Sequence, residues 1–350
     1  MDGFGLESSL HESQGLTLPR IVIIQLLLVL LATGIYDTVV YRHPSQPPFT
    51  FSNPLLTQTS DGEILLQIRV TNTGIRPIQL NGMFQNQFVP PLEFQPTLVQ
   101  PGSSSIGSAR SSWKVATFDG LSTYVRTPNA AAINSRNMTV EVFFKYASLT
   151  PDRQMIIAKG QAGQNSFYFY SFRSVNNIND LVMFANGTRY DQQLGDIFVP
   201  GNWYDVVFTV DGREVTAYIN GNFVESWAHA VSFLGNSQDL FIGSCSCGGY
   251  QFNGSIATVR LYDRPLSSQE IRYNYANPQP IYSGLSLWYQ FNQTSGAVAR
   301  DLSGGGNDGA VNGSLSFQPP LEIGRYYGVV ITASTPDDRG FSLEIGVKAT

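Results

Sequence analysis

The chain has 350 residues, a length that allows more than one folded core, since domains usually contain roughly 100–200 residues. Charged residues make up only 13% of the chain, aromatic residues reach 12%, and the formal net charge is -5 without a basic cluster. This balance predicts an all-β fold. It excludes nucleic acid as a partner, because phosphate binding requires clustered lysine and arginine.

A long apolar segment runs from Ile21 to Tyr41 (IVIIQLLLVLLATGIYDTVVY), with Arg20 before it and Arg42 after it. Its length matches the roughly 20 residues that cross a bilayer as a helix. We therefore expect a leader over residues 1–20 and one transmembrane helix over residues 21–41, with the bulk of the chain outside the cell. The alternative is a cleaved signal peptide whose apolar part is residues 21–31.

Segments in which apolar and polar residues alternate lie on both sides of the central part of the chain. Residues 42–54 are rich in proline and serine and are expected to form a linker. Glu63–Thr71 (EILLQIRVT) alternates as a strand, and Arg325–Lys348 contains two further alternating runs around a turn. Because a two-stranded ribbon is not stable alone, we expect residues 55–108 and 321–350 to form one small β-sandwich together.

The apolar segment is similar to the N-terminal hydrophobic helix of archaeal type IV pilin-like proteins. The strand end Val70-Thr-Asn-Thr-Gly74 is similar to a strand end that recurs in the small β-sandwich following that helix in the same proteins. The helix there anchors the precursor in the membrane and packs the core of a filament, so the resemblance implies self-association. The family processes its precursor after a basic residue followed by a small one, and Arg20-Ile21 departs from that pattern.

Residues 109–318 are expected to form one domain inserted into the small sandwich, since insertion is tolerated at a loop tip. Short alternating runs are evenly spaced here, and Asp211-Gly212 and Asn220-Gly221 lie between such runs. These dipeptides are the strongest local hairpin signal, because both residues adopt positive φ. Ser267 and Glu270 have the spacing of a capping box, which predicts one short helix.

Several motifs of this region occur in an order that closely resembles the laminin-G-like branch of the concanavalin A-like lectin/glucanase superfamily. They are Phe118-Asp-Gly120 with Tyr124-Val125, Gly201-Asn-Trp203, the two hairpins, Phe252-Asn-Gly-Ser-Ile256, and Val259-Arg-Leu-Tyr-Asp-Arg-Pro-Leu-Ser-Ser-Gln-Glu-Ile271. The resemblance implies a jelly roll of two antiparallel sheets that binds a glycan or protein ligand. The alternation of apolar and polar residues predicts the same sandwich independently.

One piece of this pattern follows the final helix instead of preceding the first strand. Leu285–Phe291 (LSLWYQF) and the loop Arg300–Gly309 (RDLSGGGNDG) resemble the opening strand and loop of the family. Either they belong to a truncated second copy, or the sandwich is circularly permuted and they complete it. We favour permutation, because too few residues remain for a second sandwich, and extend the domain to residue 318.

The sequence lacks the pattern of Glu, any residue, Asp, two residues and Glu with which retaining glucanases of this superfamily place carboxylates on one strand face. Glu141 stands alone on its predicted strand, with Phe143 and Lys145 as its neighbours on the same face. The 3 histidines cannot form a triad or a histidine-rich metal centre in this domain. We therefore expect a binding domain with no catalytic residue rather than an enzyme.

Calcium is the cofactor that the family resemblance implies, and Asp301, Asn307 and Asp308 offer oxygen ligands on a glycine-rich loop. The alternative is a solvated turn in which these side chains bond their own backbone.

Cys245 and Cys247 are the two cysteines of the chain, so no disulfide framework is expected. We interpret the pair as small residues of a loop rather than as a redox or metal pair.

Sequons for N-glycosylation occur after the apolar segment, in the large domain. They are Asn137, Asn186, Asn253, Asn292 and Asn312. Chance alone produces several in a chain this rich in Asn, Ser and Thr, but their position agrees with an exported domain.

Tyr168, Tyr170 and Tyr250 have rings that can stack on sugars, yet alternating Phe and Tyr more often form a core and a surface ladder. We prefer the latter interpretation.

The leading hypothesis is a cell-membrane protein with a single transmembrane pass, which displays a laminin-G-like binding domain outside the cell for adhesion or for glycan or protein recognition. The first alternative is a structural subunit of an archaeal pilus or virion that the large domain decorates. The second alternative is a degenerate glycan hydrolase.

Overall fold

The computed structural model describes residues 47–150, 153–160, 166–172, 178–185, 188–193, 197–228, 235–292, 296–337 and 339–350. The predicted leader and transmembrane helix, residues 1–41, lie outside these ranges. Within them, the structure contains no helix with the length and hydropathy needed to span a bilayer.

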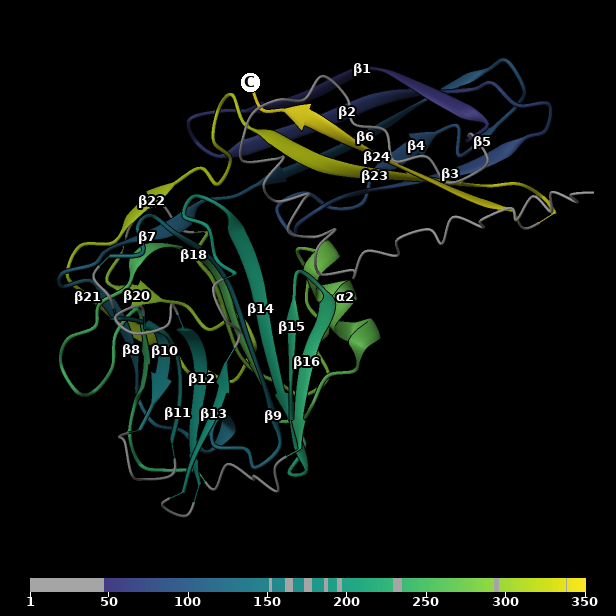
Figure 1. Ribbon diagram of the computed structural model, residues 1–350. Helices are drawn as coiled ribbons and strands as arrows, with labels where there is room; N and C mark the ends of the chain where they lie inside the picture. Colours follow the sequence, from purple (N-terminus) through teal and green to yellow (C-terminus); the bar gives the residue numbers. More distant parts are fainter. Residues whose placement is uncertain are drawn as a thin grey trace, which may run out of the picture. The chain divides into compact units, whose positions relative to one another are not determined.

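Two four-stranded antiparallel sheets form a small sandwich (Figure 1). Sheet A has the order β1–β2–β6–β4 and sheet B the order β24–β23–β3–β5. Their strands are β1 (Phe49–Gln58), β2 (Glu63–Asn72), β3 (Ile78–Phe84), β4 (Glu93–Gln95), β5 (Leu98–Val99), β6 (Ser104–Ser112), β23 (Tyr326–Ser334) and β24 (Gly340–Lys348). Because β23 pairs with β3, strands from distant parts of the chain share sheet B.

The alternation of β2 explains how the small sandwich builds its core. Ile64, Leu66 and Ile68 are buried, whereas Glu63 and Arg69 on the opposite face are exposed. Successive side chains of a strand point to opposite faces, so the apolar set of each strand enters one shared core.

Residues 115–318 form the jelly-roll sandwich, which consists of two larger sheets. Sheet C has the order β16–β15–β14–β9–β18–β7–β22, with β19 also pairing with β18, and sheet D the order β13–β12–β11–β10–β17–β8–β21–β20. The strands of sheet C are β7 (Val115–Asp119), β9 (Met138–Tyr146), β14 (Trp203–Val210), β15 (Glu214–Ile219), β16 (Asn222–Ala228), β18 (Asn253–Tyr262), β19 (Leu285–Gln290) and β22 (Ser316–Gln318). Those of sheet D are β8 (Tyr124–Thr127), β10 (Arg153–Lys159), β11 (Ser166–Phe172), β12 (Ile178–Ala185), β13 (Thr188–Gln193), β17 (Leu240–Ile242), β20 (Val298–Ala299) and β21 (Gly309–Asn312).

The segment that follows the final helix joins this same sandwich. β19 pairs with β18 in sheet C, and β21 pairs with β8 in sheet D. These pairings are those expected of a segment that supplies strands to the sandwich, not of a separate second copy. The boundaries assigned to the domains from the sequence stay a prediction.

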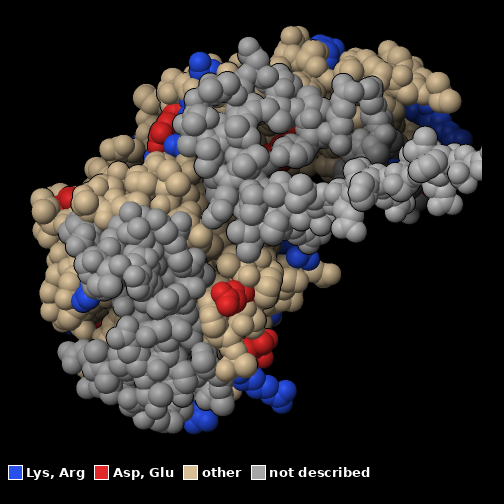
Figure 2. Space-filling model, viewed as in Figure 1, with Lys and Arg blue, Asp and Glu red and all other residues tan. Residues whose placement is uncertain are grey.

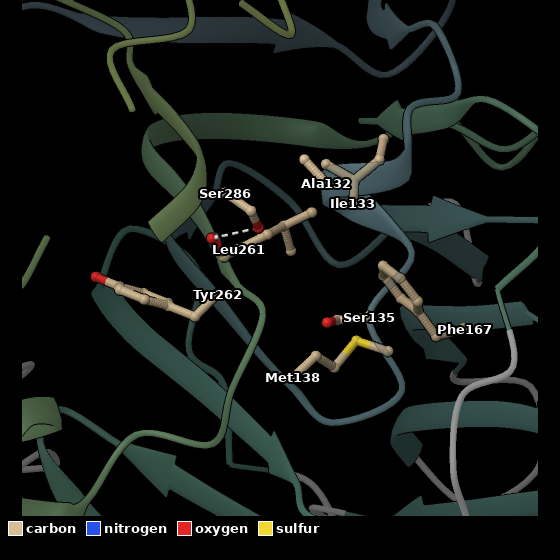
Figure 3. Close-up of a pocket in the computed structure, with 8 residues that line it drawn as sticks. All are labelled: Ala132, Ile133, Ser135, Met138, Phe167, Leu261, Tyr262 and Ser286. Atoms are coloured by element: carbon tan, nitrogen blue, oxygen red, sulfur yellow. Dashed lines mark hydrogen bonds between the residues drawn. The ribbon is translucent and has the colours of Figure 1, made fainter. Parts of the chain in front are cut away.

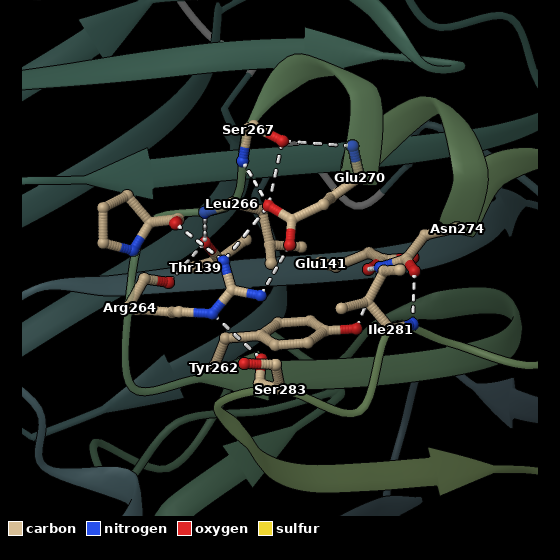
Figure 4. Close-up of polar contacts among 11 residues, drawn as sticks. Thr139, Glu141, Tyr262, Arg264, Leu266, Ser267, Glu270, Asn274, Ile281 and Ser283 are labelled. Atoms are coloured by element: carbon tan, nitrogen blue, oxygen red, sulfur yellow. Dashed lines mark hydrogen bonds and ion pairs between the residues drawn. The ribbon is translucent and has the colours of Figure 1, made fainter.

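The described residues include two short helices, the 3-10 helix η1 (Ala131–Ile133) and the α-helix α2 (Ser268–Ala276). The predicted capping box of α2 is confirmed: Glu270 N donates to Ser267 Oγ, and Ser267 N donates to Glu270 Oε2 over 2.9 Å (Figure 4). The hydrogen bond from Arg264 holds the pKa of Glu270 at about 2. This cap fixes where α2 starts against sheet C.

The small sandwich packs on the outer face of sheet C through Phe88. Its ring centroid lies 5.4 Å from that of Trp113, 4.9 Å from that of Phe143 and 5.0 Å from that of Trp203. Phe143 and Ala257 of sheet C belong to the same buried cluster as the core of the small sandwich. The two sandwiches therefore share one continuous apolar contact.

Replacing this ring with a methyl group tests how strongly the contact stabilises the protein. Phe88→Ala leaves a cavity between three aromatic rings, so we expect the free energy of unfolding to fall by about 3–5 kcal/mol. Denaturant unfolding followed by tryptophan fluorescence measures the change. Leu121→Ala is the control, because Leu121 is 79% exposed and its truncation should cost less than about 0.5 kcal/mol. Equal effects of the two changes would contradict the shared contact.

Candidate functional site

Each sheet of the large sandwich has one face in the core and one outer face. The outer face of sheet C is covered by the small sandwich, where Phe88 packs on Phe143, and by α2, where Ile271 packs in one buried cluster with Val207 and Tyr262. In sheet D, Val125 and Ile242 point into the core, so their neighbours in sequence point outward. The exposed and partly buried side chains of β8 and β17 therefore lie on the outer face of sheet D.

The outer face of sheet D carries two aromatic rings beside a cation. Arg126 of β8 lies opposite Phe241 of β17 on one side and Ala310 of β21 on the other. Tyr124, two residues before Arg126, stacks at an angle on Phe241, with ring centroids 5.8 Å apart. The side chain of Arg126 is 58% exposed. We call Tyr124, Arg126, Phe241 and Ala310 the aromatic face.

A charged pair lies at the edge of the aromatic face. Arg126 Nε donates to Asp239 Oδ2 over 2.5 Å, and Asp239 Oδ1 accepts from Asn129 N over 2.9 Å. The ammonium of the buried Lys159 donates to Asn129 Oδ1 over 2.7 Å and to Gln238 O over 2.6 Å. Burial lowers the pKa of Lys159 to about 8. Lys159 thus holds together the two turns that orient Asp239.

In the loop after β17, Cys245 and Cys247 form a disulfide. The interpretation of this pair as merely small residues of a loop is therefore wrong. Cys245 is buried and packs with Ala158 and Tyr168 on the outer side of sheet D. Cysteines two positions apart in the chain, with Cα atoms 5.2 Å apart, lie within the separation that a disulfide can bridge. The bridge folds this loop over part of the sheet.

The three tyrosines considered for sugar stacking have different outcomes. Tyr168 is buried, which confirms its interpretation as a packing residue. The side chain of Tyr170 lies outside the described residues. Tyr250 is 40% exposed and carries the guanidinium of Arg153 over its ring, 4.8 Å from the centroid. Tyr124 and Phe241 were missed, and the signal that could have found them is the alternation of their strands about Val125 and Ile242.

Glu141 is the one acid on its strand β9, as expected, but charged residues on the neighbouring strands lie close to it. Arg260 lies opposite Glu141 on the neighbouring strand β18, and Asp205 lies diagonally across from it on β14. Glu141 Oε1 accepts from Arg260 Nη1 over 2.5 Å and Oε2 from Asn274 Nδ2 over 2.8 Å. Both acids are fully buried under α2 and the small sandwich, so a substrate has no access to them.

A small cavity lies between η1, β9 and β18 (Figure 3). Its volume is about 10 Å³, which is room for about one water molecule. The lining residues are Ala132, Ile133, Ser135, Met138, Phe167, Leu261, Tyr262 and Ser286. Apolar atoms dominate this lining, and Ser286 Oγ donates to Leu261 O. The cavity is too small for a sugar ring.

The loop proposed to bind calcium is held by hydrogen bonds to its carboxylates. Asp301 Oδ1 accepts from Trp288 N and Ser303 N over 3.0 and 2.9 Å, and Oδ2 accepts from Asn307 N over 2.9 Å. Asp308 Oδ1 accepts from Asp301 N over 2.8 Å, and Asp308 Oδ2 accepts from Arg300 Nη1 over 2.7 Å. Across the described ranges, no three acidic, cysteine or histidine side chains come together as metal ligands. Hydrogen bonds from Asn307 N to Asp301 and from Asp301 N to Asp308 bring these three residues together. The arrangement suits a turn closed by its own backbone.

The predicted glycosylation sites differ in their surroundings. Asn137 and Asn292 are exposed, Asn253 and Asn312 are partly buried, and Asn186 lies outside the described residues. Asn292 Nδ2 donates to Ser112 O over 2.9 Å, so its amide is engaged in the connection between the two sandwiches. Asn312 lies opposite Tyr124 in the register of β21 and β8, beside the aromatic face.

Figure 2 shows separate acidic and basic side chains among the described atoms of the face it displays, without a continuous basic patch.

Removing the carboxylate of Asp301 tests the two interpretations of its loop. Asp301→Ala leaves the N–H groups of Trp288, Ser303 and Asn307 without their acceptor, so we expect unfolding to become easier by about 1–3 kcal/mol. The loss should be the same in calcium and in a chelator, as measured by denaturant unfolding. Stabilisation of the wild-type chain by calcium, absent in the variant, would instead establish the metal site.

Among solved structures, a putative carbohydrate binding protein from Bacteroides ovatus matches with a TM-score of 0.49 and 14% identity, over 75% of this chain and 94% of that one. The CBM40 module of a Ruminococcus gnavus sialidase, bound to sialyllactose, matches with a TM-score of 0.38 and 16% identity, over 45% and 95%. A search of curated proteins found no match. Residues 118–272 match the model of the concanavalin A-like lectin/glucanases superfamily, which confirms the family expected for the large domain.

Proposed function

We propose that the large domain is a glycan-binding module and that the aromatic face is its binding surface. The observation that carries this proposal is the placement of Tyr124, Phe241 and Arg126 together on the outer face of sheet D. The superfamily contains both lectins and glucanases. Burial of Glu141 and Asp205 away from any substrate favours binding over hydrolysis.

The chemistry of the aromatic face suits a sugar. A pyranose ring has apolar C–H faces and a rim of hydroxyl groups, so it needs an aromatic surface beside polar groups. Tyr124 and Phe241 supply the rings. Arg126 has further N–H donors besides the Nε that Asp239 occupies, and Asp239 supplies acceptor oxygens. A protein ligand with an acidic side chain would use the same guanidinium.

We further propose that the chain is anchored in the cell membrane by residues 21–41 and displays this module outside the cell, for adhesion or recognition. The proposal rests on the apolar length of the segment and on the sequons, which follow it. Calcium at the Asp301 loop is the alternative proposal to a turn closed by its own backbone, and it concerns a place apart from the aromatic face.

Glycan binding is tested with the full chain on an array of surface glycans, followed by titration with the best ligand. Phe241→Ala and Arg126→Ala should each weaken binding about tenfold, because one aromatic contact or charge-assisted hydrogen bond is worth about 1–2 kcal/mol. Phe223→Ala is the matched control, since Phe223 is 61% exposed but lies on β16 at the edge of sheet C. Equal losses in all three variants, or retained binding in the first two, would disprove the assignment.

The chain's own glycosylation is controlled in the same experiment. Because Asn312 lies beside Tyr124, a glycan on Asn312 would compete for the aromatic face. Asn312→Gln protein from a glycosylating host should therefore bind at least as tightly as wild type.

The anchor is tested by fractionation of cells that express the full chain. A transmembrane helix keeps the protein in membranes after alkaline extraction, and we expect this result because the segment is long enough to span the hydrocarbon. A variant lacking residues 21–41 is the control and should not enter the membrane fraction. Recovery of the wild-type chain in filaments sheared from cells would instead favour the pilus-subunit hypothesis.

A further inference from the structure

The junction between sheet C and the small sandwich buries a polar cluster that glycan binding does not use. Its members are Glu141, Asp205, Arg260 and Asn274 of the large sandwich and Gln87 of the small one. Glu141, Asp205, Arg260 and Gln87 are all fully buried. Gln87 Oε1 accepts from Arg260 Nη2 over 2.9 Å and from Thr258 Oγ1 over 3.2 Å. The small sandwich therefore completes the cluster.

The cluster contains one more carboxyl group than it has cations. Arg260 is paired with Glu141, and both oxygens of that carboxylate are occupied, by Arg260 and by Asn274. Asp205 is fixed by its backbone, whose N–H donates to Asn220 Oδ1 over 2.9 Å. Among the described residues, neither carboxyl oxygen of Asp205 has a hydrogen-bond partner. An ionised Asp205 would be buried away from water and would have no hydrogen-bond donor.

The titratable groups around Asp205 also favour its protonated form. They are Glu141 on β9, Arg260 and Tyr262 on β18, and Tyr275 on α2, which in turn interacts with Glu344 on β24. Burial raises the pKa of Tyr262 and of Tyr275, so neither tyrosine adds charge near neutral pH. Burial, and then the charge of Glu141, raise the pKa of Asp205 well above its usual range, against the opposing effect of Arg260.

We propose that a proton on Asp205 closes the junction, so that the small sandwich is held on sheet C most tightly in acid and progressively less tightly as the pH rises. The protonated carboxyl is neutral and leaves the Glu141–Arg260 pair balanced. Above the pH at which an unfolded aspartate ionises, the unfolded chain releases its proton while the folded chain keeps it. The stabilisation is therefore complete at low pH and is lost as the pH rises toward the pKa of the folded protein.

Asp205→Asn in the full chain tests the proton, because the amide resembles a protonated carboxyl that cannot ionise. From pH 4 to pH 8, the folding equilibrium constant of wild type relative to the variant should fall by up to about tenfold per pH unit, or about 1.4 kcal/mol. The fall ends where Asp205 ionises in the folded protein. Asp263→Asn is the matched control, because Asp263 is exposed and the same loss of charge there should leave the pH profile unchanged. Glu141→Gln should weaken folding at every pH, since it breaks the pair with Arg260.

Hydrogen exchange of the wild-type chain provides a measurement at the junction itself. Exchange of the amides of Gln87 and Phe88, corrected for the intrinsic effect of pH, should accelerate between pH 4 and pH 8 in wild type and stay constant in Asp205→Asn. Parallel pH profiles of wild type and variant would overturn the proposal. So would a wild-type stability at pH 8 that depends on whether sodium, potassium or calcium is present at equal ionic strength, because a cation would then replace the proton.

Discussion

The packing of the small sandwich on sheet C is the constraint on which the other features of this protein depend. Each sheet of a sandwich has an outer face, on which apolar residues need a cover and charged residues need water or buried partners. Phe143 and Ala257 of sheet C are buried because Phe88 and its neighbours lie on them. With that face occupied, the outer face of sheet D is the one on which we propose that a ligand binds, and the aromatic face lies there.

The same packing explains why charged groups are tolerated in the interior. A buried ion pair rarely stabilises a fold by itself, since desolvation costs about as much as the attraction returns. Glu141 and Arg260 remain because Asn274 and Gln87 supply hydrogen bonds that the lost water would have made. Gln87 comes from the small sandwich, so the ion pair is complete only when both sandwiches are in place. The cluster thus links the fold of one sandwich to the other.

Local patterns in the chain predicted the elements that depend on neighbouring residues. Alternation in Glu63–Thr71 predicted β2, the Asn220-Gly221 dipeptide predicted the turn between β15 and β16, and Ser267 with Glu270 predicted the start of α2. The order of motifs predicted the superfamily of the large domain. Each of these follows from interactions within a few residues, or from a spacing that strand period and turn chemistry impose. Such signals are readable without knowing which strands become neighbours.

The site residues depend on those neighbours and were therefore less predictable. Glu141 is the one acid on strand β9, as expected, but the strand considered by itself does not reveal its partner Arg260 on β18 or the acid Asp205 on β14. Tyr124 and Phe241 likewise meet only through the pairing of β8 with β17. The class of fold and the existence of its strands were already contained in the alternation of the chain. The burial of the acids and the assembly of the aromatic face were decided by tertiary structure, because strand register alone determines which distant side chains share a face.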